Sequence, residues 1–287
     1  WDYGPLGVEL KNNIKKEWWK SMVYMREDIV GFDAAIIMNP TVWEKSGHLK
    51  AFTDPLVECK KCHHRFKVDS VGDKCPECDG QFTEPKTFNL MTEVLLGTTE
   101  PKEKSYLRGE ITQGVFVNFE NVVSSSRVKI PFGIAQIGKA FRNEITPGNF
   151  TFRSREFEQM ELEYFVRPDA WQDSFEMWRK EINQFINTVG ITTDGVSEHE
   201  IPDEDRAHYS KRTIDFEFEF PFGKKELYGL AYRTDYDLEN HTASSGVDLS
   251  YLDEETKEKF TPHVIEPSLG VDRTILAILT SAYREDE

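Results

Sequence analysis

Apolar residues recur at helical spacing in three stretches of the chain. The first stretch, residues 6–25, carries them one turn apart, at Leu10, Ile14, Trp18 and Met22. The second, residues 171–189, is apolar along one side, is expected to be capped by Asp169 and ends at Gly190, a residue type favoured just after helices. The third follows Gly270. Each pattern predicts an amphipathic helix with one face on a core.

Two other segments, residues 157–166 and 213–220, alternate between apolar and polar residues over most of their length, which is the period of a strand. Their polar faces consist of Gln159, Glu161 and Glu163 in the first segment and Asp215, Glu217 and Glu219 in the second. The alternation predicts an antiparallel sheet with one face on a core and an acidic face toward water or a ligand. For the second strand we interpret the acidic face as a solvated outer surface.

A short apolar run, residues 32–42, is stopped by Pro40 and predicts a strand followed by a turn. Residues 111–166 are mostly strand-like. Helices and strands are segregated along the chain, which predicts the α+β class with an antiparallel β-sheet flanked by helices, and argues against a doubly wound sheet. The chain has no GxxxxGK[ST] motif and no GxGxxG between a strand and a helix, so a bound nucleotide would need another kind of site.

Composition limits the class of protein without deciding its function. Hydrophobic residues make up 38% and charged residues 30% of the 287-residue chain, an ordinary globular balance. The formal net charge is −16, the wrong sign for a protein that grips nucleic acid over its whole surface. No apolar run is long enough to cross a bilayer, and the first residues do not resemble a signal peptide. We therefore expect a cytoplasmic protein.

The cysteines form two CxxC pairs separated by twelve residues. They are Cys59, Cys62, Cys75 and Cys78. Their clustering differs from the scattered cysteines of a disulfide-stapled fold. Two such turns complete a closed tetrahedral shell of thiolates, which is typical of structural zinc. We predict a Zn²⁺ site in an insert spanning residues 57–84, with His63 and His64 as surface neighbours. The alternative is a fortuitous pair of reduced thiol turns.

Residues 141–166 have the pattern of a hairpin with arginines at its mouth. One strand ends at Phe141-Arg142-Asn143-Glu144, and after a Pro-Gly loop the next begins near Arg153. Guanidinium groups that face one another across a loop suit bidentate binding of phosphate oxygens, and the ring of Phe157 can stack on a base. By charge alone, a surface hairpin with weak ion pairs explains the segment equally well.

The spacing resembles motif 2 of the class II aminoacyl-tRNA synthetases, Phe-Arg-x-Glu, a loop, then Arg-x-x-x-Phe-x-x-x-Asp/Glu. The matching residues are Phe141, Arg142, Glu144, Arg153, Phe157 and Glu161. Ser268 to Arg273 (SLGVDR) resembles motif 3, and residues 6–42, with Gly31, Phe32 and Pro40, resemble motif 1. WDYGPLGVELKNNI, REFEQMELEYF, RTDYDLENH and VIEPSLGVDR narrow the resemblance to the bacterial homodimeric glycyl type, in which serine at the start of motif 3 is usual.

The resemblance implies a class II synthetase-like fold and a site for ATP with Mg²⁺. In that site Arg142 would meet the α-phosphate, Arg153 the γ-phosphate, and Arg273 would face the adenine opposite Phe157; these three arginines are the expected catalytic residues. The full ATP set implied is Arg142, Asn143, Glu144, Phe152, Arg153, Phe157, Glu226, Leu227, Gly270 and Arg273. The glycine set implied is Glu110, Phe157, Gln159, Glu161, Glu266, Ser268 and Gly270.

The implied function is activation of glycine with ATP and transfer of glycine to the 3′ end of tRNA(Gly). Residues 1–56 and 85–287 would form the catalytic domain around the insert, and the segment near Pro40 would form a homodimer interface. We expect the family's C-terminal anticodon-binding domain to be absent from this chain. Two positions depart from the family pattern: Gly109 stands where proline is usual, and Lys67 where arginine is usual.

Three alternatives compete with this interpretation. A class II core of another specificity, such as serine, threonine or proline, is disfavoured by the glutamate-rich pocket. A non-catalytic synthetase-like module that binds RNA or regulates a partner is disfavoured by retention of the arginines. A zinc-ribbon nucleic-acid binder is disfavoured by the net charge of −16.

Overall fold

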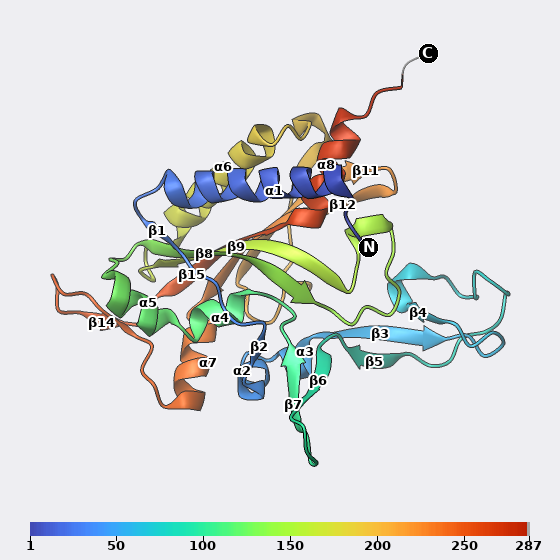
Figure 1. The fold of residues 1–287 in the computed structure, drawn as a ribbon, viewed down its shortest axis with the longest axis horizontal. Coiled ribbons are helices and arrows are strands. Elements are labelled where there is room, and N and C mark those ends of the chain that lie inside the picture. Colours follow the sequence, from blue (N-terminus) through green and yellow to red (C-terminus); the bar gives the residue numbers. More distant parts are fainter. Residues whose placement is uncertain (286–287) are drawn as a thin grey trace.

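The computed structural model describes residues 1–285, which are built around one seven-stranded β-sheet (Figure 1). In spatial order its strands are β1 (Ile29–Gly31), β8 (Phe132–Phe141), β9 (Glu156–Val166), β15 (His263–Gly270), β12 (Gly223–Thr234), β11 (Arg212–Phe220) and β10 (Val196–Glu200). Neighbouring strands are antiparallel, except that β1 runs parallel to β8. The predicted α+β class with an antiparallel sheet is confirmed.

One face of this sheet is covered by three helices, α1 (Pro5–Trp19), α6 (Trp171–Thr188) and α8 (Val271–Ala282) (Figure 1). They are the three helices that the apolar periodicity predicts, and α1 continues as a π-helical turn over Lys20–Tyr24. The apolar faces of β9 and β11 point at them and form the main core with Trp18, Phe175 and Trp178. Burying each such side chain contributes about 1.5–3 kcal/mol, so this face anchors the sheet.

Asp169 does not cap α6, contrary to the prediction. The capping position is Ala170, which provides no side-chain hydrogen bond, and the Asp169 side chain is 86% exposed. The Ala170 N–H bonds the Arg167 carbonyl oxygen at 3.0 Å in a tight turn after β9, and this turn places the capping position one residue past Asp169.

The other face of the sheet is covered at one end by α4 (Thr112–Phe116), α5 (Phe119–Ser126) and α7 (Tyr236–Ser245), over a second apolar cluster. The remainder of this face is polar and borders the cavities described below. The helices α4 and α5 correct the prediction that residues 111–166 are mostly strand. Val115, Phe116, Phe119 and Val122 are buried at helical spacing, a period that the valines, which favour strands, obscure.

The run 32–42 is not a strand and turn. It contains the two-residue strand β2 (Ile37–Met38), and Pro40 begins a helix, α2 (Pro40–Lys45), followed by α3 (His48–Ala51). The Asn39 side-chain oxygen accepts the Thr41 N–H at 2.9 Å, and proline suits the first helical position because its φ is already helical. Strand β2 joins β7 (Glu103–Leu107), which pairs with β6 (Thr92–Leu96).

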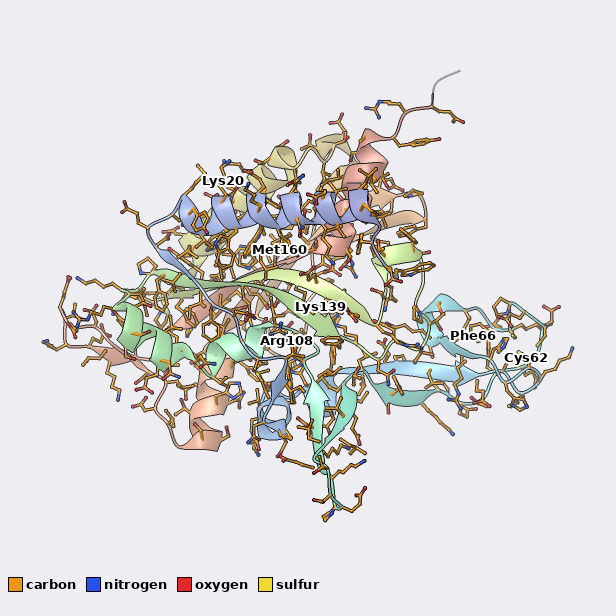
Figure 2. The ribbon with its side chains drawn as sticks, in the orientation of Figure 1. Lys20, Cys62, Phe66, Arg108, Lys139 and Met160 are labelled. Carbon is orange, nitrogen blue, oxygen red and sulfur yellow. The ribbon has the colours of Figure 1, made fainter. Side chains whose placement is uncertain are left out.

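A separate three-stranded sheet projects from the body, with β3 (Thr53–Glu58) between β4 (Arg65–Lys67) and β5 (Lys86–Asn89) (Figure 1). Figure 2 shows Cys62 and Phe66 on this extension and Met160 within the body. A small hairpin, β13 (Tyr251–Leu252) and β14 (Lys259–Phe260), lies at the opposite end. In the described range 1–285, none of the helices combines the length and apolar character that crossing a bilayer requires.

Candidate functional site

A cavity of about 380 Å³ opens where the loop between β8 and β9 meets the start of α8. Its walls include the three arginines predicted as catalytic, Arg142, Arg153 and Arg273. The Arg142 Nε donates to the Gly109 carbonyl oxygen at 3.1 Å, and the guanidinium lies 5.2 Å from the centre of the Phe157 ring. Within residues 1–285, no carboxylate lies within ion-pair distance of Arg142, so this half-buried cation faces the cavity without a counter-ion.

The other two arginines are held loosely by carboxylates. Arg153 Nη1 lies 3.3 Å from Glu144 Oε2, and Arg273 Nη1 lies 2.9 Å from Glu226 Oε2. Arg273, with help from Arg142 and Arg153, keeps the pKa of Glu226 below its ordinary value. Both ion pairs lie at an open cavity, so the two guanidinium groups can exchange their carboxylates for a ligand. The arrangement therefore suits a ligand that carries several negative charges.

A second cavity, of about 680 Å³, adjoins the first. The two share the side chains of Phe52, Arg142, Gln159, Glu226 and Ser268 together with Ala51. The second is lined by Glu110, Glu161 and Glu266 and by residues 205–209. Asp215 also lines it and is half-buried, which corrects the interpretation of the β11 acidic face as a purely solvated surface; the chain segment 201–209 covers that part of the strand.

The glutamates of the second cavity belong to a buried polar network centred on Arg233, whose side chain is fully buried. Arg233 donates to Asp237 through Nε at 2.8 Å and Nη2 at 3.1 Å, and to both oxygens of Glu266 through Nη1 at 3.0 Å. The Tyr209 ring centre lies 3.7 Å from its guanidinium carbon. All three guanidinium nitrogens are engaged, so Arg233 orients carboxylates and is not free for a ligand.

Glu161 is held from three sides. Its oxygens accept from Ser268 at 2.6 Å, from Gln159 at 2.6 Å and from the Thr112 hydroxyl at 2.8 Å. Burial, followed by the charge of Glu110, raises the pKa of Glu161 above its ordinary value. Burial, opposed by Arg233 and aided by Glu161 and Glu110, also raises the pKa of Glu266 above its ordinary value. The pocket is thus short of positive charge, which favours a cationic head group.

Glu110 behaves differently from its neighbours. It lies 3.2 Å from His48 Nε2 and accepts from the Gln113 amide at 3.1 Å. Burial would raise the pKa of Glu110, but His48 and Arg233 outweigh it, so the pKa lies below its ordinary value. A buried carboxylate that stays ionised at neutral pH is well suited to an ammonium group.

Most residues predicted for ATP and glycine lie around these two cavities. Asn143 is the exception: it lines neither cavity, and its N–H bonds the Leu90 carbonyl oxygen at 2.7 Å. Phe157 and Gly270, predicted for both ligands, line the first cavity and not the second. Phe152 and Leu227 also border the first cavity. The roles assigned to individual residues remain predictions.

Sequence reasoning missed the residues that hold the glutamates, directly or through Arg233 and Gln113. They are His48, Thr112, Gln113, Tyr209, Arg233 and Asp237. The available signal was in RTDYDLENH, where Arg233 and Asp237 are four residues apart and Asp237 lies in the first turn of a helix. Without the fold, nothing connects that pair to Glu266.

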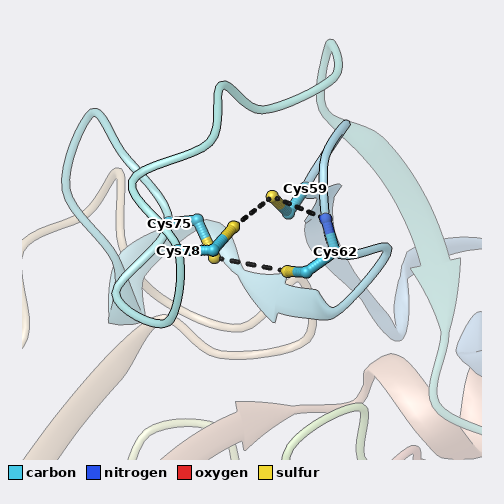
Figure 3. A group of neighbouring side chains, drawn as sticks. All are labelled: Cys59, Cys62, Cys75 and Cys78. Carbon is cyan, nitrogen blue, oxygen red and sulfur yellow. Dashed lines mark hydrogen bonds between the residues drawn. The ribbon is translucent and has the colours of Figure 1, made fainter.

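The four cysteines converge on one point of the extension (Figure 3). Cys59 Sγ lies 3.5 Å from Cys78 Sγ, and Cys62 Sγ lies 3.6 Å from Cys75 Sγ. Tetrahedral zinc with Zn–S bonds of about 2.3 Å requires sulfur atoms about 3.8 Å apart, so the donor set fits the ion. A Cβ on Gly80 would lie 2.7 Å from Cys59 Sγ, so this position needs glycine. His63 and His64 are exposed, as predicted.

Comparisons with known proteins identify the family of the chain. Residues 93–282 match the tRNA synthetase class II core domain (G, H, P, S and T). The glycine–tRNA ligase of Thermobifida fusca is 51% identical, with 100% of this chain and 67% of that protein aligned. The glycine–tRNA ligase of Ureaplasma urealyticum is 50% identical, over 98% of this chain and 66% of that protein. The chain therefore spans about two thirds of the length of these relatives.

The fold has a solved counterpart. Giardia lamblia prolyl-tRNA synthetase, determined in complex with prolyl-adenylate, superposes with a TM-score of 0.69 over 96% of this chain and 46% of that one, at 13% sequence identity. At that identity the likeness concerns the fold alone. With the family-model match and the identities of about one half over the full chain, it follows that the chain belongs to the glycine–tRNA ligase family of class II aminoacyl-tRNA synthetases.

Proposed function

We propose that this chain activates glycine with ATP to give glycyl-adenylate and pyrophosphate, and passes glycine to the 3′ end of tRNA(Gly). The observation that carries the proposal is the pair of adjoining cavities. One presents guanidinium groups, including an Arg142 that lacks a counter-ion within residues 1–285, and the other presents carboxylates. ATP and an amino acid have the complementary charges, and Arg142 lies in the shared wall where they would meet.

In this proposal Arg142 binds the α-phosphate. The glycine carboxylate is already ionised and attacks phosphorus, so the protein needs no general base at this step. Negative charge grows on the α-phosphate oxygens, and a fixed guanidinium stabilises that charge more than the ground state. Arg153 would hold the γ-phosphate of a bent ATP, Arg273 and Phe157 would enclose the adenine, and Glu144 would accept from its amino group.

Glu226 is proposed as the carboxylate nearest to the Mg²⁺ of the ATP complex. Its side chain is 47% exposed at the cavity, and it already balances Arg273. The ion would neutralise phosphate charge and keep the polyphosphate bent.

The glycine ammonium is proposed to lie among Glu110, Glu161 and Glu266, with Ser268 and Gln159 holding Glu161. In this proposal the α-carbon of glycine faces these buried groups, so a larger side chain would collide with them and steric exclusion would give specificity without a second, hydrolytic site. Specificity for another amino acid is the nearest alternative, since the second cavity, of about 680 Å³, has room for more than glycine.

Three further assignments extend the proposal. Cys59, Cys62, Cys75 and Cys78 would hold a structural Zn²⁺ that keeps the two turns of the ribbon together. The segment near Pro40 would form a homodimer interface, and the acceptor end of tRNA(Gly) would reach the shared wall of the two cavities. A cytoplasmic location is part of the same proposal.

The test is ATP–pyrophosphate exchange measured with glycine, alanine, serine, threonine and proline in turn, followed by charging of tRNA(Gly). We expect exchange with glycine alone. Exchange with another amino acid selects a different specificity, and no exchange with a folded, zinc-loaded protein selects the non-catalytic module. Exchange without tRNA charging would confine the activity of this chain to adenylate formation.

A further inference from the structure

Glu163 is a buried carboxyl that the proposed function does not use. It lies on β9 two residues beyond Glu161 and on the same face of the sheet, its side chain is fully buried, and it lines neither cavity. Within the described chain, neither of its carboxyl oxygens has a hydrogen-bond partner. Since an ionised carboxylate without any donor is costly to bury, this side chain needs an explanation.

Most of the charged neighbours of Glu163 are carboxylates. Each of Glu161, Glu163 and Glu266 offers an oxygen that lies within 4.8 Å of the other two. The charged groups that face Glu163 from the packed elements are Glu161 on β9, Glu266 on β15, Arg233 on β12 and Asp237 on α7. The cross-strand neighbour on β8 is Ile134. Four carboxylates therefore share one guanidinium in this buried cluster.

Donors are distributed unequally over the three glutamates. Glu161 accepts from three groups, and Glu266 accepts from Arg233 through both oxygens. The Thr112 hydroxyl lies within hydrogen-bond distance of both Glu161, at 2.8 Å, and Glu266, at 3.0 Å, but has a single proton to give. The cluster is one proton short, and Glu163 is the carboxyl at which an added proton replaces no existing donor.

We propose that Glu163 is a protonated carboxylic acid that donates its proton to Glu266 and thereby positions Glu266 toward the substrate ammonium. The two side chains have oxygens within 4.8 Å of one another but share no hydrogen bond in the described chain, so the proposal requires a rotation of the Glu163 side chain toward Glu266. Glu163 acts through Glu266 and touches no substrate, so it is a positioning residue. The identity of the ammonium rests on the proposed function; the protonation of Glu163 does not. Burial, followed by the charge of Glu266, raises the pKa of Glu163 well above its ordinary value, in agreement with the geometry.

Two substitutions separate the protonated acid from the other roles that this side chain can have. Glu163→Gln keeps the shape and a donor but cannot ionise, and Glu163→Leu fills the space without a donor. In glycine-dependent exchange we expect Glu163→Gln to keep KM for glycine within about twofold, and Glu163→Leu to raise it about ten- to a hundredfold with KM for ATP unchanged, because Glu266 is no longer held in place. The exposed Glu219→Gln serves as the matched control.

Both opposite results overturn the proposal. If Glu163→Gln fails to fold, or raises KM as much as Glu163→Leu does, the carboxylate must be ionised. If both variants behave like the wild type, the side chain only fills space. If the wild type shows no glycine-dependent exchange, the proposed function is contradicted instead. Thermal unfolding then still tests whether Glu163 is protonated.

Thermal unfolding tests the proton without any activity. A carboxyl with a raised pKa keeps its proton in the folded protein after the unfolded chain has released it, so its burial lowers stability increasingly as pH rises above the ordinary glutamate range. Glu163→Gln removes this penalty. We expect its midpoint to exceed that of the wild type by a margin that grows from pH 5 to pH 8, whereas Glu219→Gln shows no such trend. A margin that does not change with pH would rule out a protonated Glu163.

Discussion

Arg142 and Arg233 illustrate two opposite uses of an arginine within one molecule. Arg142 is half-buried, faces the first cavity and, in the described chain, has no carboxylate partner; Arg233 is fully buried, and its nitrogens are committed to Asp237 and Glu266. A guanidinium with unused donors at a cavity indicates a binding site for an anionic ligand. A guanidinium whose donors are used builds the wall against which a ligand of the opposite sign binds.

The largest effect is expected from removing Arg233. Arg233→Ala leaves Glu266 and Asp237 as buried anions without their cation, and breaking such a pair costs about 3–5 kcal/mol. We expect a large fall in the thermal midpoint together with loss of exchange. Differential scanning calorimetry measures the fall, with the exposed Arg284→Ala as control. If Arg233→Ala is as stable as the wild type, Arg233 does not hold the buried carboxylates in place, and its proposed difference from Arg142 is wrong.

Arg142→Ala should have the complementary effect. The side chain has no ion pair within residues 1–285, so we expect little change in unfolding. The loss of a preorganised cation at the α-phosphate should lower the rate of exchange about a hundred- to a thousandfold. Steady-state exchange and a thermal scan on the same sample measure both quantities. Arg142→Lys, which keeps the charge but not the planar fork, should recover part of the rate; retention of most activity by Arg142→Ala would refute the assignment.

The pH dependence of stability tests whether Glu110, which lies near Arg233, is ionised in the folded protein. Because the pKa of Glu110 is lowered in the folded protein, the unfolded chain takes up its proton first as pH falls. Its contribution to stability is therefore present above the ordinary glutamate pKa of about 4.3 and is lost below it. We expect Glu110→Gln to be less stable than the wild type by about 1–3 kcal/mol at pH 7, with the difference shrinking steadily as pH falls below about 4.3 toward the lowered folded pKa. Urea unfolding at several pH values provides the measurement, and a pH-independent difference would contradict the lowered pKa of Glu110.

The smallest effect concerns the insert that carries the four cysteines. Lys67 lies in the insert but also lines the first cavity, where its Nζ is 2.8 Å from Asp54. Removal of zinc by a chelator should loosen this strand and weaken ATP binding by about 1 kcal/mol, the value of one partly exposed charge, without changing glycine binding. Calorimetric titration with each ligand tests this, and Lys67→Ala should reproduce the loss. If neither zinc removal nor Lys67→Ala changes the affinity for ATP, the cysteine insert does not contribute to the first cavity.

The two arginines also show how far the sequence alone reaches. The motif spacing identified Arg142, Arg153 and Arg273, and the alternation of β9 and β11 identified the apolar faces of the sheet. The polar faces could not be interpreted in the same way, since the groups that cover Glu161 and Glu266 come from distant segments: Thr112 on α4, Arg233 on β12 and Tyr209 in the loop before β11. Sequence period gives which side a residue faces but not what is packed against it.

Local signals failed where tertiary packing or backbone geometry outweighed them. Asp169 is a good capping residue one position too early, and Pro40 breaks a strand but equally begins a helix. In both cases the turn preceding the helix, and not the intrinsic preference of the residue, decides where the helix starts.

The wall shared by the two cavities has a consequence for the mixed anhydride that joins their two ligands. A molecule that carries an ammonium at one end and a nucleotide at the other would occupy both chambers at once, with Arg142 at its phosphate. Because the second contact of a tethered ligand forms at high effective concentration, such an intermediate should leave far more slowly than either precursor. Slow escape would give a reactive acyl phosphate time to meet its acceptor before water destroys it.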